Sequence, residues 1–212
     1  MVSSIVEHWR KLTGAVHPDD AIALRSSLHS FNLDFPPPAY IGDIDRAPVV
    51  LLEANGGYDP GRTPREFRDP SFVTTYLDLL HNPRSVDPAS IAPYYGQRNY
   101  SRLIAAGQLV LVNAVAYRSK GISTEPANKG LAEKLVSTRI HRNWLRKELL
   151  PAALRGERLV IAHRNGLWKL KSSEGPMHGV IFTTNAISPD MSLEVLKLIN
   201  TFLSKVAATR QI

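Results

Sequence analysis

The 212-residue sequence contains no cysteine, which removes several classes of protein from consideration. Disulfide frameworks, thiolate nucleophiles and cysteine-based zinc or iron–sulfur sites are excluded. The sequence also lacks an apolar run near the roughly 18 residues of a membrane span. Its amphipathic first residues do not have the basic and then apolar segments of a signal peptide. We therefore expect a cytoplasmic protein with no membrane contact.

The composition is that of an ordinary globular protein, with 43% hydrophobic and 21% charged residues. A chain of this length suits one well-cored domain better than two. There is no internal repeat, low-complexity run or linker. We expect residues 1–212 to form a single domain, in which residues 1–35 make an N-terminal helical layer ahead of the prolines at 36–38.

Four short apolar runs predict strands, at residues 48–52, 109–112, 159–162 and 180–183. Their successive apolar residues are typical of strands buried on both faces of a parallel sheet. Helical spacing appears at residues 4–12, 19–31, 70–81, 100–106, 130–150 and 192–208. The predicted fold class is a three-layer α/β/α domain with a central, mainly parallel four-stranded sheet. An active site is expected outside the carboxyl ends of the strands.

The first loop at that edge begins Glu53-Ala54-Asn55-Gly56-Gly57-Tyr58-Asp59. The two glycines permit positive φ and close approach of the backbone to a ligand, and Tyr58 offers a flat aromatic wall. This composition suits a planar, hydrogen-bonding ligand. A tight turn with a packed tyrosine is the alternative explanation.

The second and fourth loops also contain candidate polar groups. Asn113 ends the second apolar run, where its amide could present a donor and an acceptor to a base or could cap a turn. The fourth run leads into Asn185-Ala186-Ile187-Ser188-Pro189, which could equally begin the last helix. Beyond the third run, His163, Arg164 and Trp168 could line a groove, with core packing as the alternative.

Positive charge is concentrated in one segment of the chain. Residues 139–171 hold nine basic and two acidic residues, which accounts for the whole formal net charge of +7. Arg139, Arg142 and Arg146 are spaced so that they share one helix face. This face could contact an anionic partner such as nucleic acid, or it could simply be solvated.

Taken in order, the three loops resemble the motifs of the uracil-DNA glycosylase superfamily. That family carries G-Q-D-P-Y or G-x-N-P-G after its first core strand, L-L-L-N at a middle strand end, and an H-P-S-P-like loop near its end. Here the corresponding segments are E-A-N-G-G-Y from Glu53, L-V-L-V-N-A-V from Leu109, and N-A-I-S-P from Asn185. Glu53, Gly56 and Asn185 replace the Gly, Pro and His of the family pattern.

The resemblance implies that a damaged, deaminated base is flipped out of DNA and its N-glycosidic bond hydrolysed. Asn55 would position the water, and Asp59 or Glu53 would accept its proton. The base would be stacked and read by Tyr58, Phe67, Asn113 and Asn185. DNA phosphates would be contacted by Arg118, Lys120, Ser188 and Arg164. No metal or organic cofactor is needed for such a hydrolysis.

The partner implied is DNA, single-stranded or carrying a lesion, bound by a monomer. The substitutions at Glu53, Gly56 and Asn185 leave open a second function, a non-catalytic protein of the same fold that binds nucleic acid, a nucleobase or a nucleotide. A third class, a phosphate-cradling hydrolase, is disfavoured. The sequence has no P-loop, no dinucleotide glycine motif and no nucleophile elbow.

Overall fold

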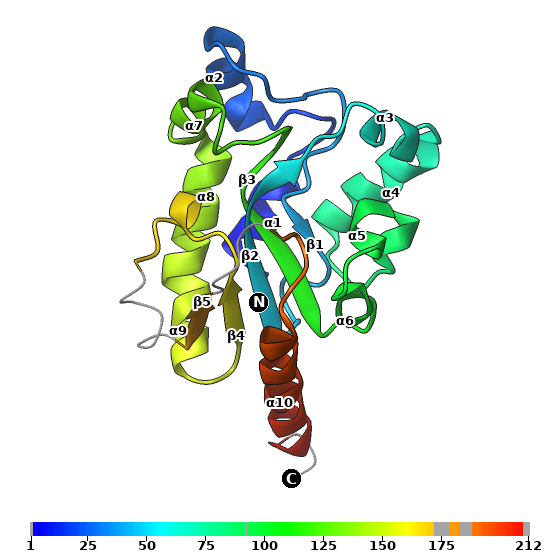
Figure 1. Ribbon diagram of the computed structural model, residues 1–212. Coiled ribbons are helices and arrows are strands. Elements are labelled where there is room, and N and C mark those ends of the chain that lie inside the picture. Colours follow the sequence, from blue (N-terminus) through cyan, green and yellow to red (C-terminus); the bar gives the residue numbers. More distant parts are fainter. Residues whose placement is uncertain (1, 92, 172–178, 183–187, 210–212) are drawn as a thin grey trace.

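The computed structural model describes residues 2–91, 93–171, 179–182 and 188–209, which form a mixed α/β fold (Figure 1). Its sheet has the strand order β1-β3-β2-β4-β5. The strands are β1 (Tyr40–Ile41), β2 (Val49–Gly57), β3 (Leu109–Ser119), β4 (Leu159–Ala162) and β5 (Val180–Phe182). The pairs β2–β3, β2–β4 and β4–β5 are parallel, and β1 is antiparallel to β3.

The sheet corrects the expected four-stranded, mainly parallel arrangement, because it is mixed and has a fifth strand. Tyr40 and Ile41 pair with Val112 and Leu111 of β3 in the antiparallel sense. Two residues cannot establish an alternating or continuous apolar pattern, so the sequence gives no periodic signal for this edge strand. The α/β class itself is confirmed, since helices and parallel pairs alternate along the chain.

The segment from Asn55 to Gly57 is part of a strand and not the predicted loop. It extends β2 beside an equally extended β3, with Asn55 opposite Val115 and Gly57 opposite Ser119 across a bulge. Gly56 is needed for space and not for positive φ, because a Cβ there would lie 2.2 Å from the Pro38 side chain. The proline-rich segment therefore packs directly on the extended strand.

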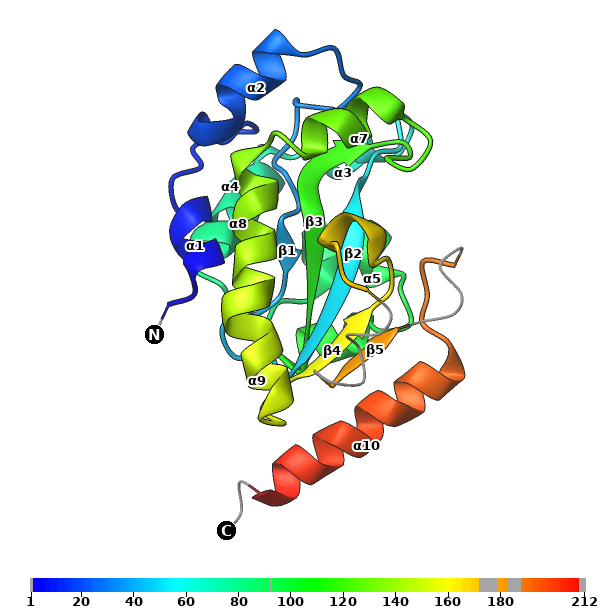
Figure 2. The same ribbon diagram turned by 90° about the vertical axis from the view of Figure 1, so that its left-hand side faces the viewer.

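Helices cover both faces of the sheet. Figures 1 and 2 show α4 to α6 on one face and α7 to α9 on the other, with α1 near the β1 edge. The ten α-helices of the described chain are α1 (Ser4–Trp9), α2 (Ala21–Ser26), α3 (Thr63–Glu66), α4 (Pro70–His81), α5 (Pro93–Gly96), α6 (Ser101–Ala105), α7 (Pro126–Ala132), α8 (Val136–Trp144), α9 (Leu150–Leu154) and α10 (Leu193–Thr209). None of them is long and apolar enough to cross a membrane.

The predicted helix at 130–150 is in fact a series of connected segments. A wider helical turn, Leu145–Leu149, joins α8 to α9. Pro151 lies in the first turn of α9 and has no N–H to donate to the preceding turn, which accounts for this irregularity. The segment expected to be one helix is thus interrupted between Ala132 and Val136, and its hydrogen-bonding pattern changes at Leu145, ahead of the proline.

The core encloses the strands on both faces, as their continuous apolar runs predict. Val49, Val50, Leu51 and Leu52 are all fully buried. Burying each such side chain stabilises the fold by roughly 1.5–3 kcal/mol relative to leaving it in water. This packing fixes β2 at the centre of the sheet, so that residues at its carboxyl end have a rigid support.

Candidate active site

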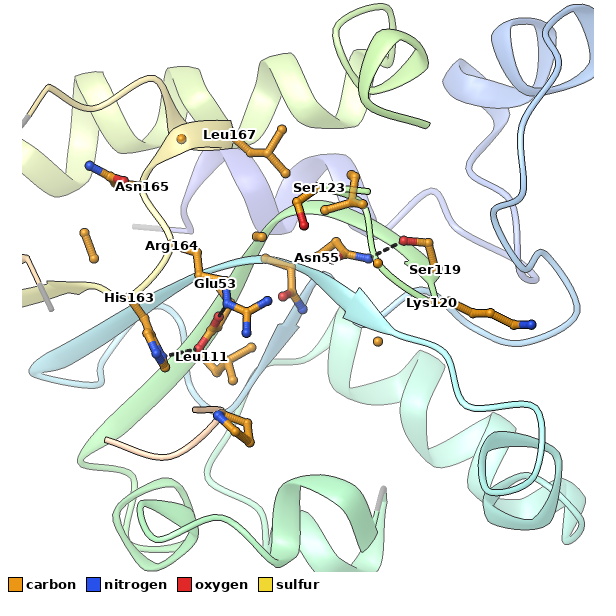
Figure 3. A pocket seen from close by; sticks show the side chains of 18 of the residues that line it. Glu53, Asn55, Leu111, Ser119, Lys120, Ser123, His163, Arg164, Asn165 and Leu167 are labelled. Atoms are coloured by element: carbon orange, nitrogen blue, oxygen red, sulfur yellow. Dashed lines mark hydrogen bonds and ion pairs between the residues drawn. The ribbon is translucent and has the colours of Figure 1, made fainter. Parts of the chain in front are cut away.

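The carboxyl ends of β2, β3 and β4 border a cavity of about 810 Å³ (Figure 3). Glu53 and Asn55 belong to β2, and Asn113 and Ser119 belong to β3. His163 directly follows β4. The cavity therefore lies at the edge of the sheet where the strand pattern predicts a site. It brings together the first and second candidate loops of the sequence.

Glu53 is the acidic side chain of this cavity, and it is held by two basic side chains. Its Oε1 lies 2.8 Å from His163 Nδ1, and its Oε2 lies 3.8 Å from Arg164 Nε. His163 is 1% exposed in its side chain, Glu53 14% and Arg164 41%. The pair of Glu53 and buried His163 thus fixes a carboxylate at the cavity wall, where it can accept or return a proton.

The backbone of Glu53 is also fixed. Trp168 donates its indole N–H to the Glu53 carbonyl oxygen over 2.8 Å. Trp168 is fully buried and its ring stacks on that of His141, with centroids 6.4 Å apart. The packing explanation for Trp168 therefore holds, while the tryptophan also supports the strand that carries the carboxylate.

Asn55 lies beside Ser119 at the far end of the cavity. Its Nδ2 donates to the Gly56 carbonyl oxygen and to Ser119 Oγ, both over 2.9 Å. Asn55 and Glu53 are two residues apart on one strand, so their side chains share a face of the sheet. An acid–base group and an amide are thereby placed on the same wall.

Asn113 lies opposite Glu53 in the register of the parallel pair. Its side chain is buried and donates from Nδ2 to the Pro38 carbonyl oxygen over 2.5 Å. Its backbone oxygen accepts a hydrogen bond from His141 Nδ1 over 2.6 Å. Asn113 is therefore immobilised on both sides, and it does not act as a simple turn cap because β3 continues to Ser119.

Three tyrosines that sequence reasoning missed form an aromatic wall of the cavity. They are Tyr94, Tyr95 and Tyr100, in or just after α5. Burial raises the pKa of Tyr95 to about 12, although the Arg118 guanidinium and a hydrogen bond from Asn113 oppose the rise. The phenol is consequently neutral at physiological pH. The adjacent aromatic residues at 94 and 95 could have suggested a stacking surface. They lie ahead of α6 and β3, however, and not in a loop after a strand, where the site was expected.

Two lysines lie at the rim of the cavity. Lys120 follows β3, and Lys129 is in α7 and was not among the sequence candidates. Both are exposed. Together with Arg164 they give the mouth of the cavity a positive character that suits phosphate groups.

Tyr58, Asp59 and Phe67, which the sequence analysis assigned to the site, do not line the cavity. Asp59 is exposed and accepts the backbone N–H groups of Gly61 and Arg62, which lower its pKa. Phe67 is buried and stacks on Phe35, with ring centroids 4.9 Å apart. These positions follow from the extension of β2, which displaces the turn beyond Gly57.

Arg118, expected to contact phosphate, is instead buried at 3% exposure and does not line the cavity. Its guanidinium carbon lies 5.2 Å from the centroid of Phe67 and 5.8 Å from that of Tyr76. It donates to the carbonyl oxygens of Pro36 and Gly57. Arg118 therefore fastens the proline-rich segment to the end of β2.

The fourth loop is only partly described. Asn185 lies outside the described residues. Ser188 does not line the cavity, and its Oγ accepts the backbone N–H of Asp190 over 3.1 Å. Pro189 borders the cavity. Among the described residues of this loop that were candidates, Pro189 is the one that lines the cavity.

The basic face of α8 has largely structural partners. Arg142 forms a two-pronged contact with Glu133, at 2.7 and 2.8 Å, and also donates to the Leu167 carbonyl oxygen. Arg146 donates to the Lys169 carbonyl oxygen. These contacts tie the helical segment to the residues after β4, so Arg142 and Arg146 have partners within the protein, while Arg139 is exposed.

Within the described chain, His8, His17 and Asp19 form a group with approximate metal-ligand spacing. The two imidazoles are stacked, with centroids 3.7 Å apart and planes inclined by 19°. Each imidazole lone pair lies in its own ring plane, so two stacked rings cannot both point at one ion. His17 Nδ1 already accepts the Asp19 N–H. We assign the group to packing around α1.

The fold and the cavity together define an α/β protein with an acid–base pair at the carboxyl edge of its sheet. Comparison with protein-family models, with curated proteins and with solved structures finds no match for the chain.

Proposed function

We propose that the protein is a uracil-DNA glycosylase-like enzyme that hydrolyses the N-glycosidic bond of a damaged, deaminated base in DNA. The observation that carries the proposal is the convergence of Glu53, Asn55 and Asn113 on one cavity. These are residues that the motif resemblance singles out, and they come from two segments nearly sixty positions apart in the sequence. Their meeting is what a shared base-binding site requires.

Glu53 is the proposed general base. Water attacks C1′ of the deoxyribose, the C1′–O bond forms as the bond to the base breaks, and the proton of the water passes to the Glu53 carboxylate. The bonding electrons leave with the base, which then takes a proton from solvent. His163 fixes the carboxylate at 2.8 Å, and Asn55 positions the water through its side-chain oxygen.

The rest of the cavity fits a nucleotide. The tyrosines supply flat, neutral surfaces for stacking, which is worth about 1–3 kcal/mol per base in single-strand binding. Lys120, Lys129 and Arg164 at the mouth can hold the phosphates on either side of the flipped nucleotide. Glu53 replaces Asp59 as the candidate base, because Asp59 lies outside the cavity.

A second candidate function is the binding of a nucleobase, nucleotide or nucleic acid without hydrolysis. The observation that favours it is the engagement of both Glu53 oxygens, by His163 and by Arg164. The cationic Arg164 guanidinium beside the carboxylate would weaken it as a base. The two functions share the same cavity and differ in whether a glycosidic bond breaks.

The deciding experiment incubates the protein with oligonucleotides containing uracil, hypoxanthine or xanthine and then cleaves abasic sites with alkali. We expect strand scission on at least one lesion and a loss of about 100-fold or more in Glu53→Gln. The glutamine keeps an acceptor for His163, so the cavity is preserved. Asp59→Asn is the matched control and should cleave like the wild type. Binding of all three lesions without any scission would establish the second function instead.

A further inference from the structure

Two segments that border the cavity are joined by a dense set of contacts. Asn99, between α5 and α6, pairs reciprocally with the backbone of Met191. Its Nδ2 donates to the Met191 carbonyl oxygen over 2.8 Å, and its Oδ1 accepts the Met191 N–H over 3.2 Å. The backbone N–H of Asn99 donates to Asp190 Oδ1 over 3.0 Å. The chain ahead of α10 is therefore fastened to the chain after α5, although the paired residues are 91 or 92 positions apart in the sequence (Figure 1).

An arginine adds a charged contact to this joint. Arg98 Nη1 lies 3.7 Å from Asp190 Oδ2, and the arginine side chain is 12% exposed. Its guanidinium carbon lies 4.7 Å from the centroid of the Tyr94 ring, and its Nε donates to the Tyr94 carbonyl oxygen over 3.1 Å. We call Arg98, Asn99, Asp190 and Met191 the clasp. The clasp thus reaches from the chain before α10 to an aromatic ring of the cavity wall.

The clasp lies beside the cavity and does not line it. Tyr94 and Pro189 line the cavity, whereas no member of the clasp does. The Arg98 guanidinium therefore packs on Tyr94 from outside the cavity. Tyr94 is 38% exposed, so the core does not enclose its ring. The ring is restrained instead by Arg98 and by an edge-to-face contact with Tyr95, at 5.2 Å between centroids.

A ring that is already held in place is a better stacking surface than a free one. An exposed side chain that becomes ordered only when a ligand arrives loses rotamer freedom at that moment, and this loss weakens binding. The clasp orders the Tyr94 segment beforehand. Its ion pair is partly buried, at 12% exposure for the arginine and 39% for the aspartate, so solvent and salt screen it less than a pair on the open surface.

We infer that Asn99 is a positioning residue that acts through Tyr94, because the clasp holds the tyrosine ring ready to stack on a base in the cavity. This inference rests on the proposed function, which supplies the base. The clasp acts on binding and not on bond breaking, since Glu53 is fixed independently by His163 and by the Trp168 indole. Loss of Asn99 should therefore raise KM and leave kcat close to that of the wild type.

The test compares fluorescent oligonucleotides with and without a base at one position, and binding is measured by anisotropy. One carries uracil on a 2′-fluoro-arabino sugar, which resists glycosidic hydrolysis, and the other carries a tetrahydrofuran abasic site. Asn99→Ala should weaken binding of the uracil oligonucleotide by about tenfold, as expected for a lost stacking contact, and that of the abasic one by less than about twofold. Asn200→Ala, at an exposed position of α10, is the matched control and should bind both like the wild type.

A double-mutant cycle with the tyrosine separates positioning from a general loss of structure. If Asn99 acts through Tyr94, Asn99→Ala should weaken uracil binding by less than about twofold when Tyr94→Leu is already present. Equal losses on the two oligonucleotides, or fully additive losses in the double variant, would overturn the inference.

Two variants of Asp190 test the clasp without touching the asparagine. Asp190→Ala removes the acceptor of the Asn99 N–H and the ionic partner of Arg98, at a half-buried side chain whose loss the fold should tolerate. It should weaken uracil binding by about fivefold or more. Asp190→Asn keeps an acceptor for the Asn99 N–H, so it should bind within about threefold of the wild type. Wild-type binding by Asp190→Ala would contradict a role for the clasp.

Scission of a natural uracil oligonucleotide is measured separately, so the two failures can be told apart. Scission by the wild type, together with unchanged uracil binding in Asn99→Ala, would leave the proposed function standing and remove the inference. A fall in kcat larger than the rise in KM would also remove it. A base-dependent loss in Asn99→Ala without any scission would support the clasp in a binding protein and overturn the hydrolysis. An absence of wild-type binding to both oligonucleotides would overturn both.

Discussion

His141 and His163 are both buried histidines, at 0% and 3% exposure, but their surroundings differ in one respect. Both ring nitrogens of His141 are engaged by the protein. Nδ1 donates to the Asn113 carbonyl oxygen, so Nε2 is the acceptor for the Trp9 indole N–H over 2.7 Å. His163 instead pairs with Glu53 at the wall of a cavity.

The comparison shows that burial and polarity alone do not mark a functional histidine. Burial lowers the pKa of His141 to about 3, so this ring stays neutral throughout the physiological range. A perturbed pKa is often a sign of catalysis, but here it belongs to a ring enclosed by the core. What distinguishes His163 is that its carboxylate partner faces space in which a substrate can sit.

The largest effect is expected when the His141 ring is removed, which tests its purely structural role. Its loss leaves the Trp9 N–H and the Asn113 carbonyl oxygen without partners, so His141→Ala should lower the free energy of unfolding by about 3 kcal/mol at pH 8. Scission assayed well below the melting temperature should persist. Denaturant unfolding monitored by tryptophan fluorescence gives the stability.

The same variant has a defined pH dependence. The folded pKa of His141 lies below its ordinary value of 6.5, so as the pH falls the unfolded wild type binds a proton that the folded form refuses. This contribution to stability is complete above pH 6.5 and is lost as the pH falls toward 3. The stability difference between wild type and variant should therefore shrink by about 1.4 kcal/mol per pH unit. A difference independent of pH would contradict the assignment.

A smaller effect is expected at the other histidine. His163→Asn places an amide N–H near the Nδ1 position, which keeps Glu53 oriented but cannot exchange a proton. We expect scission to fall by about 10- to 100-fold and its pH profile to flatten, with little change in melting temperature. An unchanged pH profile would show that His163, like His141, has only a structural role.

The smallest effect is expected at the lysines of the cavity rim, Lys120 and Lys129. In the described chain neither of them contacts His141 or His163. Removing one phosphate contact should lower the slope of log affinity against log salt by about one. Lys129→Ala should show this change when DNA binding is titrated from low to moderate salt. Lys147→Ala, in the turn between α8 and α9, is the matched control. Equal slopes for both variants would place the DNA elsewhere.

Much of the scaffold was predictable from the sequence. The continuous apolar runs identified β2 to β5, and the helical spacing over residues 70–81 gave both ends of α4. The rule that sites lie at carboxyl strand ends led to Glu53, Asn55 and Asn113. These successes depend on local patterns, which the chain carries within short windows.

The rest depends on distant packing. Asn55-Gly56-Gly57 has turn composition, but pairing with β3 and contact with Pro38 hold it extended. This extension removes Tyr58 and Asp59 from the site. The three tyrosines of the cavity wall lie in the connection between β2 and β3, which folds back over the carboxyl ends of the strands. Arg118 is buried against Phe67 and Tyr76. No window of sequence contains both members of these contacts.

The contact between Gly56 and Pro38 reaches further than its size suggests. The missing Cβ lets the proline-rich segment lie against β2, and the Pro38 carbonyl oxygen then sets the orientation of Asn113. The orientation of the Asn113 amide is therefore set by the packing of the proline-rich segment. The absence of a Cβ on one strand thus decides how an amide on the neighbouring strand is turned, with its nitrogen toward Pro38.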